Sequence, residues 1–207
     1  MRPRPERLRP ERRVVLALGS NLGDRLGHLD EAVRALATTA GLRIHAVSKV
    51  VESPAWKPEG VDADAPGYFN AVVVGSTTLE PLALLEATSA IEVSGGRLRG
   101  DGEQRWGDRT IDIDIVAIGG VVSDDPRLTL PHPRAAVRAF VLEPWLDVEP
   151  TAVLPGGGPV AELRARAGDT VTDRPETIAW QRTRPSRGAG TPTSTASGRI
   201  DPESSTP

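Results

Sequence analysis

The chain has 207 residues, a formal net charge of −3, an isoelectric point near 5.7 and no cysteine. This length suffices for one hydrophobic core, and the lack of cysteine excludes a disulfide framework, a thiol nucleophile and a thiolate metal site. The weak negative charge gives no global attraction to nucleic acid, and no apolar run is long enough to span a membrane. We therefore expect a cytoplasmic protein with no nucleic-acid or membrane partner, in which any metal ion is bound by oxygen.

Both ends of the chain have compositions that disfavour folding. Residues 1–12 are rich in arginine and proline and lack the apolar region of a secretory signal. Residues 181–207 consist mainly of Pro, Ser, Thr, Gly and Arg, which bury too little apolar area to become ordered. We predict a disordered extension at 1–12, one folded domain at 13–180 and a disordered tail at 181–207.

Between these ends, strand and helix patterns alternate. In chain order, the sequence first predicts a strand at 14–18, a helix from the N-cap Asp24 to a stop at Gly41, a strand at 44–51 and a long loop at 52–67. A strand at 71–77, a helix from Pro81 to Gly95 and Gly96, and an irregular loop at 97–107 follow. The last predicted elements are a strand at 111–116, which enters a hairpin through Gly119 and Gly120, and a short helix from Pro133. The order β-α-β-β-α-β with C-terminal additions indicates the α+β class. It matches a ferredoxin-like sandwich, an antiparallel sheet with both helices on one face.

The segment 105–116, RWGDRTIDIDIV, is the most informative stretch of the sequence. Side chains alternate along a strand, so Asp112 and Asp114 share one face, about 7 Å apart, while the neighbouring isoleucines face the core. Two carboxylates on a half-buried face require cations such as Mg²⁺. Arg105 and Arg109, just before them, would then meet an anionic ligand that the metal also holds.

Aromatic residues are scarce, at 3 %, and gather around the two long loops. Those in or beside the loops are Trp56, Tyr68, Phe69 and Trp106, and Phe140 lies in the late helix. Such residues favour a flat heterocyclic ligand, although for each one packing back onto the core is an equal alternative. Asn70 follows two of them and has an amide suited to hydrogen-bonding such a ring.

Five motifs in register resemble those of the hydroxymethyldihydropterin pyrophosphokinase family of folate synthesis. They are GSNLGDR at 19–25, YFNAV at 68–72, GGRLR at 95–99, RWGDRTIDIDIV at 105–116 and RLTLPHP at 127–133, within a match that spans about residues 14–150. The resemblance implies a ferredoxin-like enzyme that moves the β,γ-diphosphate of ATP onto the hydroxymethyl group of 6-hydroxymethyl-7,8-dihydropterin and releases AMP.

The resemblance also implies roles for individual residues. Two Mg²⁺ ions would be held by Asp112 and Asp114, which with Arg99 and Arg109 form the catalytic set. The pterin would stack between Tyr68 and Phe140, in a pocket completed by Ser53, Pro54, Trp56, Asn70 and Trp106. ATP would be contacted by Glu92, Arg97, Arg99, Arg105, Arg109, Ile115, Arg127, Thr129, His132 and Arg138. For His132 taken alone, a structural histidine between two prolines is the favoured alternative. We expect a monomer that could contact other folate-pathway enzymes.

Three departures from the family pattern concern the loops. Ala55 stands where a second proline is common, GDGEQ at 100–104 is acidic where relatives can carry lysine, and Asp108 adds a negative charge near the metals.

Other functional classes remain open on the sequence alone. An RNA-binding module is disfavoured because the aromatic pattern of such domains and a basic surface are missing. A metal-dependent nucleotidyl or glycosyl transferase is the better alternative, although no nucleotide-sugar site is evident. A noncatalytic relative would be expected to lack one of the two aspartates.

Overall fold

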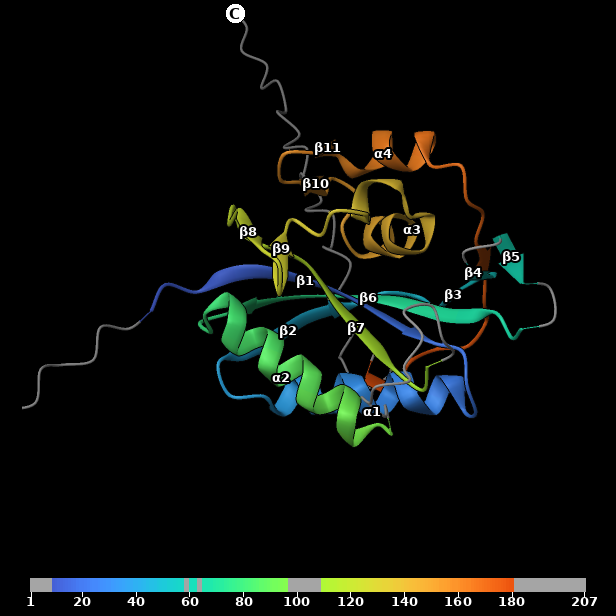
Figure 1. The fold of residues 1–207 in the computed structure, drawn as a ribbon, viewed down its shortest axis with the longest axis horizontal. Helices are drawn as coiled ribbons and strands as arrows, with labels where there is room; N and C mark the ends of the chain where they lie inside the picture. Colours follow the sequence, from blue (N-terminus) through green and yellow to red (C-terminus); the bar gives the residue numbers. More distant parts are fainter. Residues whose placement is uncertain (1–8, 58–59, 63–64, 97–108, 181–207) are drawn as a thin grey trace, which may run out of the picture.

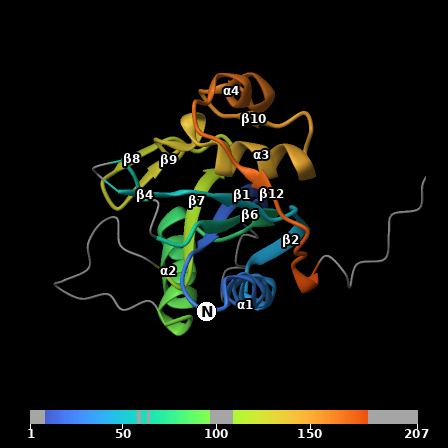
Figure 2. The ribbon, with the colours of Figure 1, turned by 90° about the vertical axis from the view of Figure 1, so that its right-hand side faces the viewer.

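A computed structural model describes residues 9–57, 60–62, 65–96 and 109–180. Its centre is an antiparallel sheet between two helical layers (Figure 1). Turned by 90°, the molecule shows α1 and α2 on one side of the sheet and α3 and α4 on the other (Figure 2). The mixed α and antiparallel β class predicted from the sequence is confirmed.

The main sheet has the strand order β12-β3-β6-β1-β7, and β2 also pairs with β6. Its strands are β1 (Arg12–Ser20), β2 (Leu42–Val47), β3 (Val51–Ser53), β6 (Tyr68–Thr77), β7 (Asp112–Ile118) and β12 (Thr172–Asp173). The smaller two-stranded sheets are β4 (Ala55–Lys57) with β5 (Gly60–Asp62), β8 (Ser123–Asp125) with β9 (Leu128–Leu130), and β10 (Val153–Leu154) with β11 (Gly158–Pro159). The helices are α1 (Arg25–Thr38), α2 (Pro81–Ser94), the 3₁₀ turn η1 (Ala135–Val137), α3 (Ala139–Val148) and α4 (Val160–Arg166).

The central strand β1 contributes to both hydrophobic layers. Val14, Leu16 and Leu18 pack into the core under α1 and α2, whereas Val15 and Ala17 pack into the core under α3 and α4. A strand covered on both faces has no polar positions to alternate with its apolar ones. This explains why the sequence shows a continuous apolar run at this point.

Both predicted helices have the expected ends. The side chain of Asp24 caps α1 by accepting a hydrogen bond from the Gly27 N–H at 3.0 Å. Pro81 opens α2, where its missing N–H costs nothing. The helix ends before Gly95 and Gly96, and Gly96 has the positive φ of 88° that suits a residue without a Cβ.

Two predictions about strand boundaries are wrong. The strand expected at 44–51 is two strands, β2 and β3, because Ser48 lies between them and both its backbone N–H and its hydroxyl hydrogen-bond the backbone of Val72. The segment expected to be a loop at 52–67 contains the end of β3 and the β4–β5 pair, and β6 begins at Tyr68 rather than at residue 71.

The hairpin predicted through Gly119 and Gly120 is also wrong. Within the described residues, β7 pairs with β1, and the strand after the glycines, β8, pairs with β9. The side chain of Asp125 accepts hydrogen bonds from the backbone and side chain of Arg127, which closes the tight turn between β8 and β9. The turn closed by Asp125 and Arg127 therefore joins β8 to β9, and β8 does not pair with β7 within the described residues.

The C-terminal segment joins the sheet, which the sequence did not predict. β12 pairs with β3 at the sheet edge, and beyond it Ile178 is fully buried in the core next to α1. The described helices include none that is long and apolar enough to cross a membrane. The tail predicted from residue 181 and most of the predicted N-terminal extension lie outside the described residues.

The contact between β2 and β6 provides a test of the fold. A Cβ added to Gly75 would lie 2.3 Å from the carbonyl oxygen of Arg43, a backbone atom that cannot turn away. We expect Gly75→Ala to lower the free energy of unfolding by about 1–3 kcal/mol, observed as a loss in Tm of about 2–4 °C for each kcal/mol. The control is Gly120→Ala, because a Cβ there meets no atom within 4 Å. Equal Tm values for the two variants would contradict the strand register.

Candidate active site

The site is built on three adjacent strands whose register brings its residues to one face. Gly19 on β1 pairs with Asn70 on β6 and with Asp112 on β7, and Ala17 pairs with Asp114. Directly paired residues point to the same side of a sheet, so Asn70 and the two aspartates share a face and lie about 10 Å apart across β1. Gly19, which has no side chain, forms the floor between Asn70 and Asp112, whereas Ala17 next to Asp114 is buried in the core under α3 and α4.

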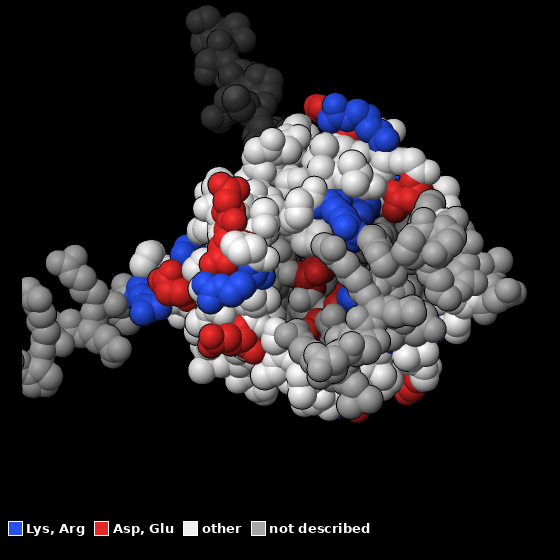
Figure 3. Space-filling model, in the orientation of Figure 1, with Lys and Arg blue, Asp and Glu red and all other residues white. Residues whose placement is uncertain are grey.

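The two carboxylates have cationic neighbours. Arg109 Nη1 lies 2.9 Å from Asp112 Oδ2, and Arg138 Nη1 lies 3.3 Å from Asp114 Oδ2. His132 Nε2 is 3.7 Å from the same Asp114 oxygen. Figure 3 shows acidic and basic side chains side by side in a hollow on the face over β7. The structure thus brings together five residues predicted from the sequence.

The electrostatic balance at Asp114 remains unfavourable to its charge. Burial raises the pKa of the Asp114 carboxyl, the neighbouring Asp112 raises it further, and His132, Arg138 and Arg109 only partly oppose this. A carboxyl with a raised pKa in such a cleft gains from an additional cation. The aspartate pair therefore has the electrostatics of a cation site.

The ring of His132 lies next to Asp114, with Nε2 toward the carboxylate. Burial lowers the pKa of His132 against the opposing effect of Asp114. Its Nδ1 accepts a hydrogen bond from the Arg134 N–H at 3.2 Å, so the ring hydrogen is on Nε2, which faces the carboxylate. Its backbone N–H donates to Val116 O at 2.8 Å, which fastens the segment after β9 to the outer edge of β7.

Two contacts fix the start of β7. Asn21 and Arg109 hydrogen-bond each other twice, since the Asn21 N–H donates to Arg109 O at 3.1 Å and the Arg109 N–H donates to Asn21 Oδ1 at 2.7 Å. On the other side, Glu92 at the end of α2 accepts a hydrogen bond from the Ile113 N–H at 2.8 Å. Ile113 lies between the aspartates, so these contacts set the position of both carboxylates.

Glu92 and Ile115, both predicted to contact the nucleotide, are buried away from the aspartate face. The side chain of Glu92 is 4 % exposed and binds the backbone of β7. Ile115 points into the core under α1 and α2. A contact between Ile115 and a nucleotide on the aspartate side would therefore have to use its backbone.

The residues predicted for the pterin lie on β3 and β6. Asn70 donates both amide hydrogens within the protein, to Ser53 Oγ at 3.0 Å and to Tyr68 O at 2.9 Å, which leaves Oδ1 to accept from a ligand. That oxygen lies over Gly19, where a Cβ would approach it to 3.3 Å. Glycine at this position therefore keeps the floor free beside Asn70.

The other predicted pterin residues have different surroundings. Phe140 is half-buried on α3, with the Arg138 guanidinium 5.2 Å from its ring centre. Pro54 is exposed between β3 and β4, and Trp56 is on β4. Trp106 lies outside the described residues.

The remaining predicted nucleotide contacts are only partly described. Arg127 is exposed and paired with Asp125 at 2.8 Å in the β8–β9 hairpin, and Thr129 is on β9 of the same hairpin. Arg97, Arg99 and Arg105 lie outside the described residues.

Phe69 differs from the sequence expectation. It was grouped with loop aromatics that could stack on a ligand, but it is 5 % exposed and belongs to the core under α1 and α2. Because β6 starts at Tyr68, alternation along the strand turns Phe69 away from Tyr68 and Asn70. Phe69 therefore packs onto the core, as the sequence allowed for each of the aromatic residues.

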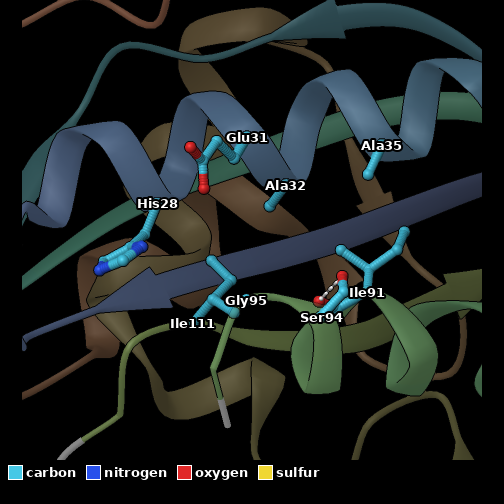
Figure 4. Close-up of a pocket in the computed structure, with 8 residues that line it drawn as sticks. All are labelled: His28, Glu31, Ala32, Ala35, Ile91, Ser94, Gly95 and Ile111. Atoms are coloured by element: carbon cyan, nitrogen blue, oxygen red, sulfur yellow. Dashed lines mark hydrogen bonds between the residues drawn. The ribbon is translucent and has the colours of Figure 1, made fainter.

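A small cavity elsewhere in the molecule is separate from this site. It lies between α1 and α2 and has a volume of about 60 Å³. Its lining includes Ile111, just before β7, and His28 and Glu31 of α1 (Figure 4). Substrate sites are usually above about 300 Å³. The cavity is too small and on the wrong face for the proposed substrates.

The donor set at the aspartates fits Mg²⁺. Within the part of the chain that the structure describes, no three His, Cys, Asp or Glu residues form a complete cage. Mg²⁺ is usually held by one or two carboxylates, with water and substrate phosphates as its other ligands. Asp112 and Asp114 provide that number of carboxylates on an open face.

Sequence reasoning missed Asn21 and Arg25 as site-forming residues, although both belong to the motif GSNLGDR. Asn21 fastens Arg109, and Arg25 contacts Glu52 and Phe69. An asparagine directly after a buried strand was the available signal for Asn21. No local pattern marks Arg25, because its partners are 27 and 44 residues away along the chain.

Comparisons with known proteins find one matching family and several similar chains. Residues 15–150 match the sequence model of the family described as 7,8-dihydro-6-hydroxymethylpterin-pyrophosphokinase (HPPK). A 2-amino-4-hydroxy-6-hydroxymethyldihydropteridine pyrophosphokinase from Methylorubrum extorquens is 42 % identical over 164 residues, covering 79 % of this chain and 99 % of that protein. The Pseudomonas aeruginosa protein of the same name is 41 % identical over 153 residues, covering 74 % and 90 %.

A solved structure shares the fold. Wild-type HPPK-DHPS of Plasmodium falciparum with pterin and p-hydroxybenzoate superimposes with a TM-score of 0.57 at 15 % identity, over 78 % of this chain and 44 % of that one. The match therefore involves less than half of the larger chain, and at this identity it supports the fold alone.

The raised pKa of Asp114 predicts a gain in stability when its charge is removed. The ionised form is disfavoured in the folded protein, so stability falls as pH rises from the unfolded to the folded pKa and stays lower above that window. At neutral pH without Mg²⁺, Asp114→Asn should raise Tm by about 2 °C, a small effect because water screens a side chain that is 37 % exposed.

The advantage should vanish below the pKa of an unfolded aspartate and be reversed by millimolar Mg²⁺, which stabilises only the wild type. Thermal melts across pH measure both effects, and Asp124→Asn, at an exposed aspartate on β8, is the control. A wild type more stable than Asp114→Asn without Mg²⁺ would contradict the electrostatics described above.

Proposed function

The chain belongs to the 7,8-dihydro-6-hydroxymethylpterin-pyrophosphokinase family, and on this premise we propose that it uses ATP and Mg²⁺ to pyrophosphorylate 6-hydroxymethyl-7,8-dihydropterin, releasing AMP. One observation supports this proposal more than any other. The register of β6, β1 and β7 brings Asn70 and the two aspartates to one face, with the Gly19 floor between Asn70 and Asp112. A flat ring bound at Asn70 would present its side arm to the carboxylates.

In this proposal the pterin lies on the β3–β6 side of the floor. Asn70 Oδ1 accepts a hydrogen bond from the ring, Ser53 orients the Asn70 amide, and Tyr68 and Phe140 stack on the ring from the sheet and from α3. Aromatic faces bind flat rings while leaving their edges to polar groups. Pro54, Trp56 and Trp106 complete the proposed pocket.

On the other side of the floor, Asp112 and Asp114 would hold two Mg²⁺ ions. Mg²⁺ bound there would neutralise phosphate charge and lower the pKa of the attacking hydroxyl, so the chain would need no separate general base. The pterin hydroxyl oxygen attacks the β-phosphorus of ATP, the bond from that phosphorus to the oxygen bridging α and β breaks, and AMP leaves with the electron pair. The hydroxyl proton passes to water.

Positive side chains supply the rest of the charge stabilisation. Arg109 and Arg138 already lie next to the carboxylates, at a site where phosphate oxygens would replace the carboxylates as their partners. Arginine suits this exchange because its planar fork binds two oxygens and keeps its charge. Arg97, Arg99 and Arg105 are proposed to line the same phosphate path, and Arg127, Thr129 and His132 to surround the nucleotide, with Ile115 contributing its backbone. Glu92, which is 4 % exposed and binds the backbone of β7, is proposed to support this site from the core side.

Several finer predictions go with this proposal. The strand order β7-β1-β6-β2 with α1 and α2 on one face supports the ferredoxin-like description of the core. The monomeric state and the cytoplasmic location stay predictions from the sequence. Contact with other folate-pathway enzymes also stays a prediction, which the fused HPPK-DHPS architecture of the Plasmodium falciparum structure makes worth testing.

The decisive assay is product analysis. Incubating the protein with ATP, Mg²⁺ and 6-hydroxymethyl-7,8-dihydropterin should yield AMP and the pterin diphosphate in equal amounts, and omitting Mg²⁺ should stop the reaction. ADP as the product, or nucleotide cleavage that does not depend on the pterin, would refute the assignment.

Replacing either carboxylate should remove most of this activity. For Asp112→Ala and Asp114→Ala we expect turnover to fall by about 10³-fold or more, because charge stabilisation at the transferred group supplies most of the rate. Circular dichroism should show an unchanged fold. Asp124→Ala, on the exposed hairpin, serves as the control. Full activity in either variant would exclude the metal role.

A further inference from the structure

A cluster on the opposite face of β3 and β6 has no part in the proposed chemistry. We propose that Arg25 and Arg174 form a clamp on Glu52 and Phe69 which positions the pterin-binding ends of β3 and β6. The inference rests on the proposed pterin site. It assigns a positioning function to Arg25 and Arg174, which do not themselves contact the substrate.

Arg25, the first residue of α1, connects both ends of the segment between β3 and β6. Its Nη1 donates to Glu52 Oε1 at 2.8 Å and to Gly67 O at 2.6 Å. Glu52 directly precedes Ser53, and Gly67 directly precedes Tyr68. One guanidinium therefore binds the residues directly before Ser53 and Tyr68, through the side chain of Glu52 and the backbone of Gly67.

Arg174 holds the same carboxylate from the other side. Its Nη1 lies 3.3 Å from Glu52 Oε2, and its backbone N–H donates to Val50 O at 3.1 Å. Both oxygens of Glu52 are therefore engaged, each by a different arginine. The side chains are only about a quarter to a third exposed, at 23 % for Arg25, 26 % for Glu52 and 32 % for Arg174.

The ring of Phe69 completes the cluster. The Arg25 guanidinium carbon lies 3.8 Å from the ring centre, and that of Arg174 lies 5.3 Å from it. Planar guanidinium groups stack on aromatic faces and gain more when they are partly desolvated. Since Phe69 pairs with Glu52 across the two strands, the clamp grips one cross-strand pair.

Close packing at Gly67 supports the idea that this junction is built for a fixed geometry. A Cβ at this position would lie 2.9 Å from Glu52 Oε1 and 3.0 Å from Ser53 O. Only a residue without a side chain lets the chain approach the Glu52 carboxylate and the Ser53 backbone this closely. The approach is what allows Arg25 to reach Glu52 and the Gly67 carbonyl together.

Arg174 is delivered by the C-terminal segment that crosses the sheet edge. This segment leaves α4, pairs with β3 as β12, and then reaches α1, where the Ala179 N–H hydrogen-bonds Asp30 (Figure 1). Ile178 anchors it in the core under α1 and α2. The chain is therefore fixed just before Arg174 by the pairing of β12 with β3, and after it by the burial of Ile178.

The alternation of side chains separates the clamp from the ligand. Tyr68 and Asn70 point to one face of β6, and Phe69 points to the other. The cross-strand partner of Tyr68 is Ser53, and that of Phe69 is Glu52. The clamp therefore acts through the backbone of these two strands, and a change in it should alter pterin binding more than ATP binding.

The test compares Arg174→Gln and Arg25→Gln with Arg164→Gln. Arg164 is a matched control: it pairs with Glu143 at 2.7 Å, is 27 % exposed and lies on α4, away from the clamp. Dissociation constants for 6-hydroxymethyl-7,8-dihydropterin are measured by calorimetry with Mg²⁺ and α,β-methylene-ATP, in which the scissile bond cannot break. Affinity for the ATP analogue, kcat and Tm are recorded for each variant.

We expect both clamp variants to weaken pterin binding by about fivefold or more, whereas Arg164→Gln should leave it unchanged. In the clamp variants, affinity for the ATP analogue and kcat at saturating pterin should stay within about twofold of the wild-type values. Arg174→Lys should restore part of the affinity, since it keeps the charge without the fork. Glu52→Gln combined with Arg174→Gln should cost less than the sum of the single changes.

The opposite result is equally clear. Clamp variants that lose Tm but bind the pterin as tightly as Arg164→Gln would overturn the clamp, while an active wild type would leave the proposed function standing. A wild type that binds no pterin and forms no AMP would overturn the proposed function and the clamp together. If Arg25→Gln does not fold, Arg174→Gln and Arg174→Lys decide the matter.

Discussion

The repulsion between the carboxylates of Asp112 and Asp114, neighbours on one face of β7, is the constraint on which the other contacts of the site depend. Asp112 and Asp114 repel each other and lose hydration at the edge of the sheet. His132, Arg138 and Arg109 compensate for only part of this. The pKa of Asp114 stays raised despite them, so the site lacks positive charge in the absence of a metal ion. A protein that only had to be stable would not retain this pair.

Strand register places the two carboxylates on the open face of β7. Because side chains alternate, a one-residue slip of β7 against β1 would turn both carboxylates into the core and the isoleucines outward. The register is fixed by contacts beyond the ladder itself, from Asn21 at the end of β1 and from Glu92 at the end of α2. On the far side of β1, the same alternation separates Asn70 from Phe69. The face proposed to bind the pterin and the face that holds Phe69 and Glu52 are thus opposite faces of the same strands.

Features that depend on local periodicity could be predicted from the sequence, and features that depend on distant partners could not. The alternation in IDIDI predicted the faces of Asp112 and Asp114, and Asp24 and Pro81 predicted the helix starts. The hairpin after β7 was predicted wrongly because Gly119 and Gly120 suggest a turn but do not specify a partner strand. β12 is a two-residue polar strand with no periodicity to detect. Phe69 was misplaced because the predicted start of β6 was three residues late.

The residues that flank 97–108 hold the start of β7 from outside that segment. Before it, Gly95 packs so closely on Ile111 that a Cβ would lie 2.7 Å from that side chain; after it, Arg109 is tied to Asn21. A third contact, from Glu92 to the Ile113 N–H, comes from the end of α2. A replacement confined to 97–108, such as the acidic GDGEQ, therefore removes none of the contacts that position Asp112 and Asp114.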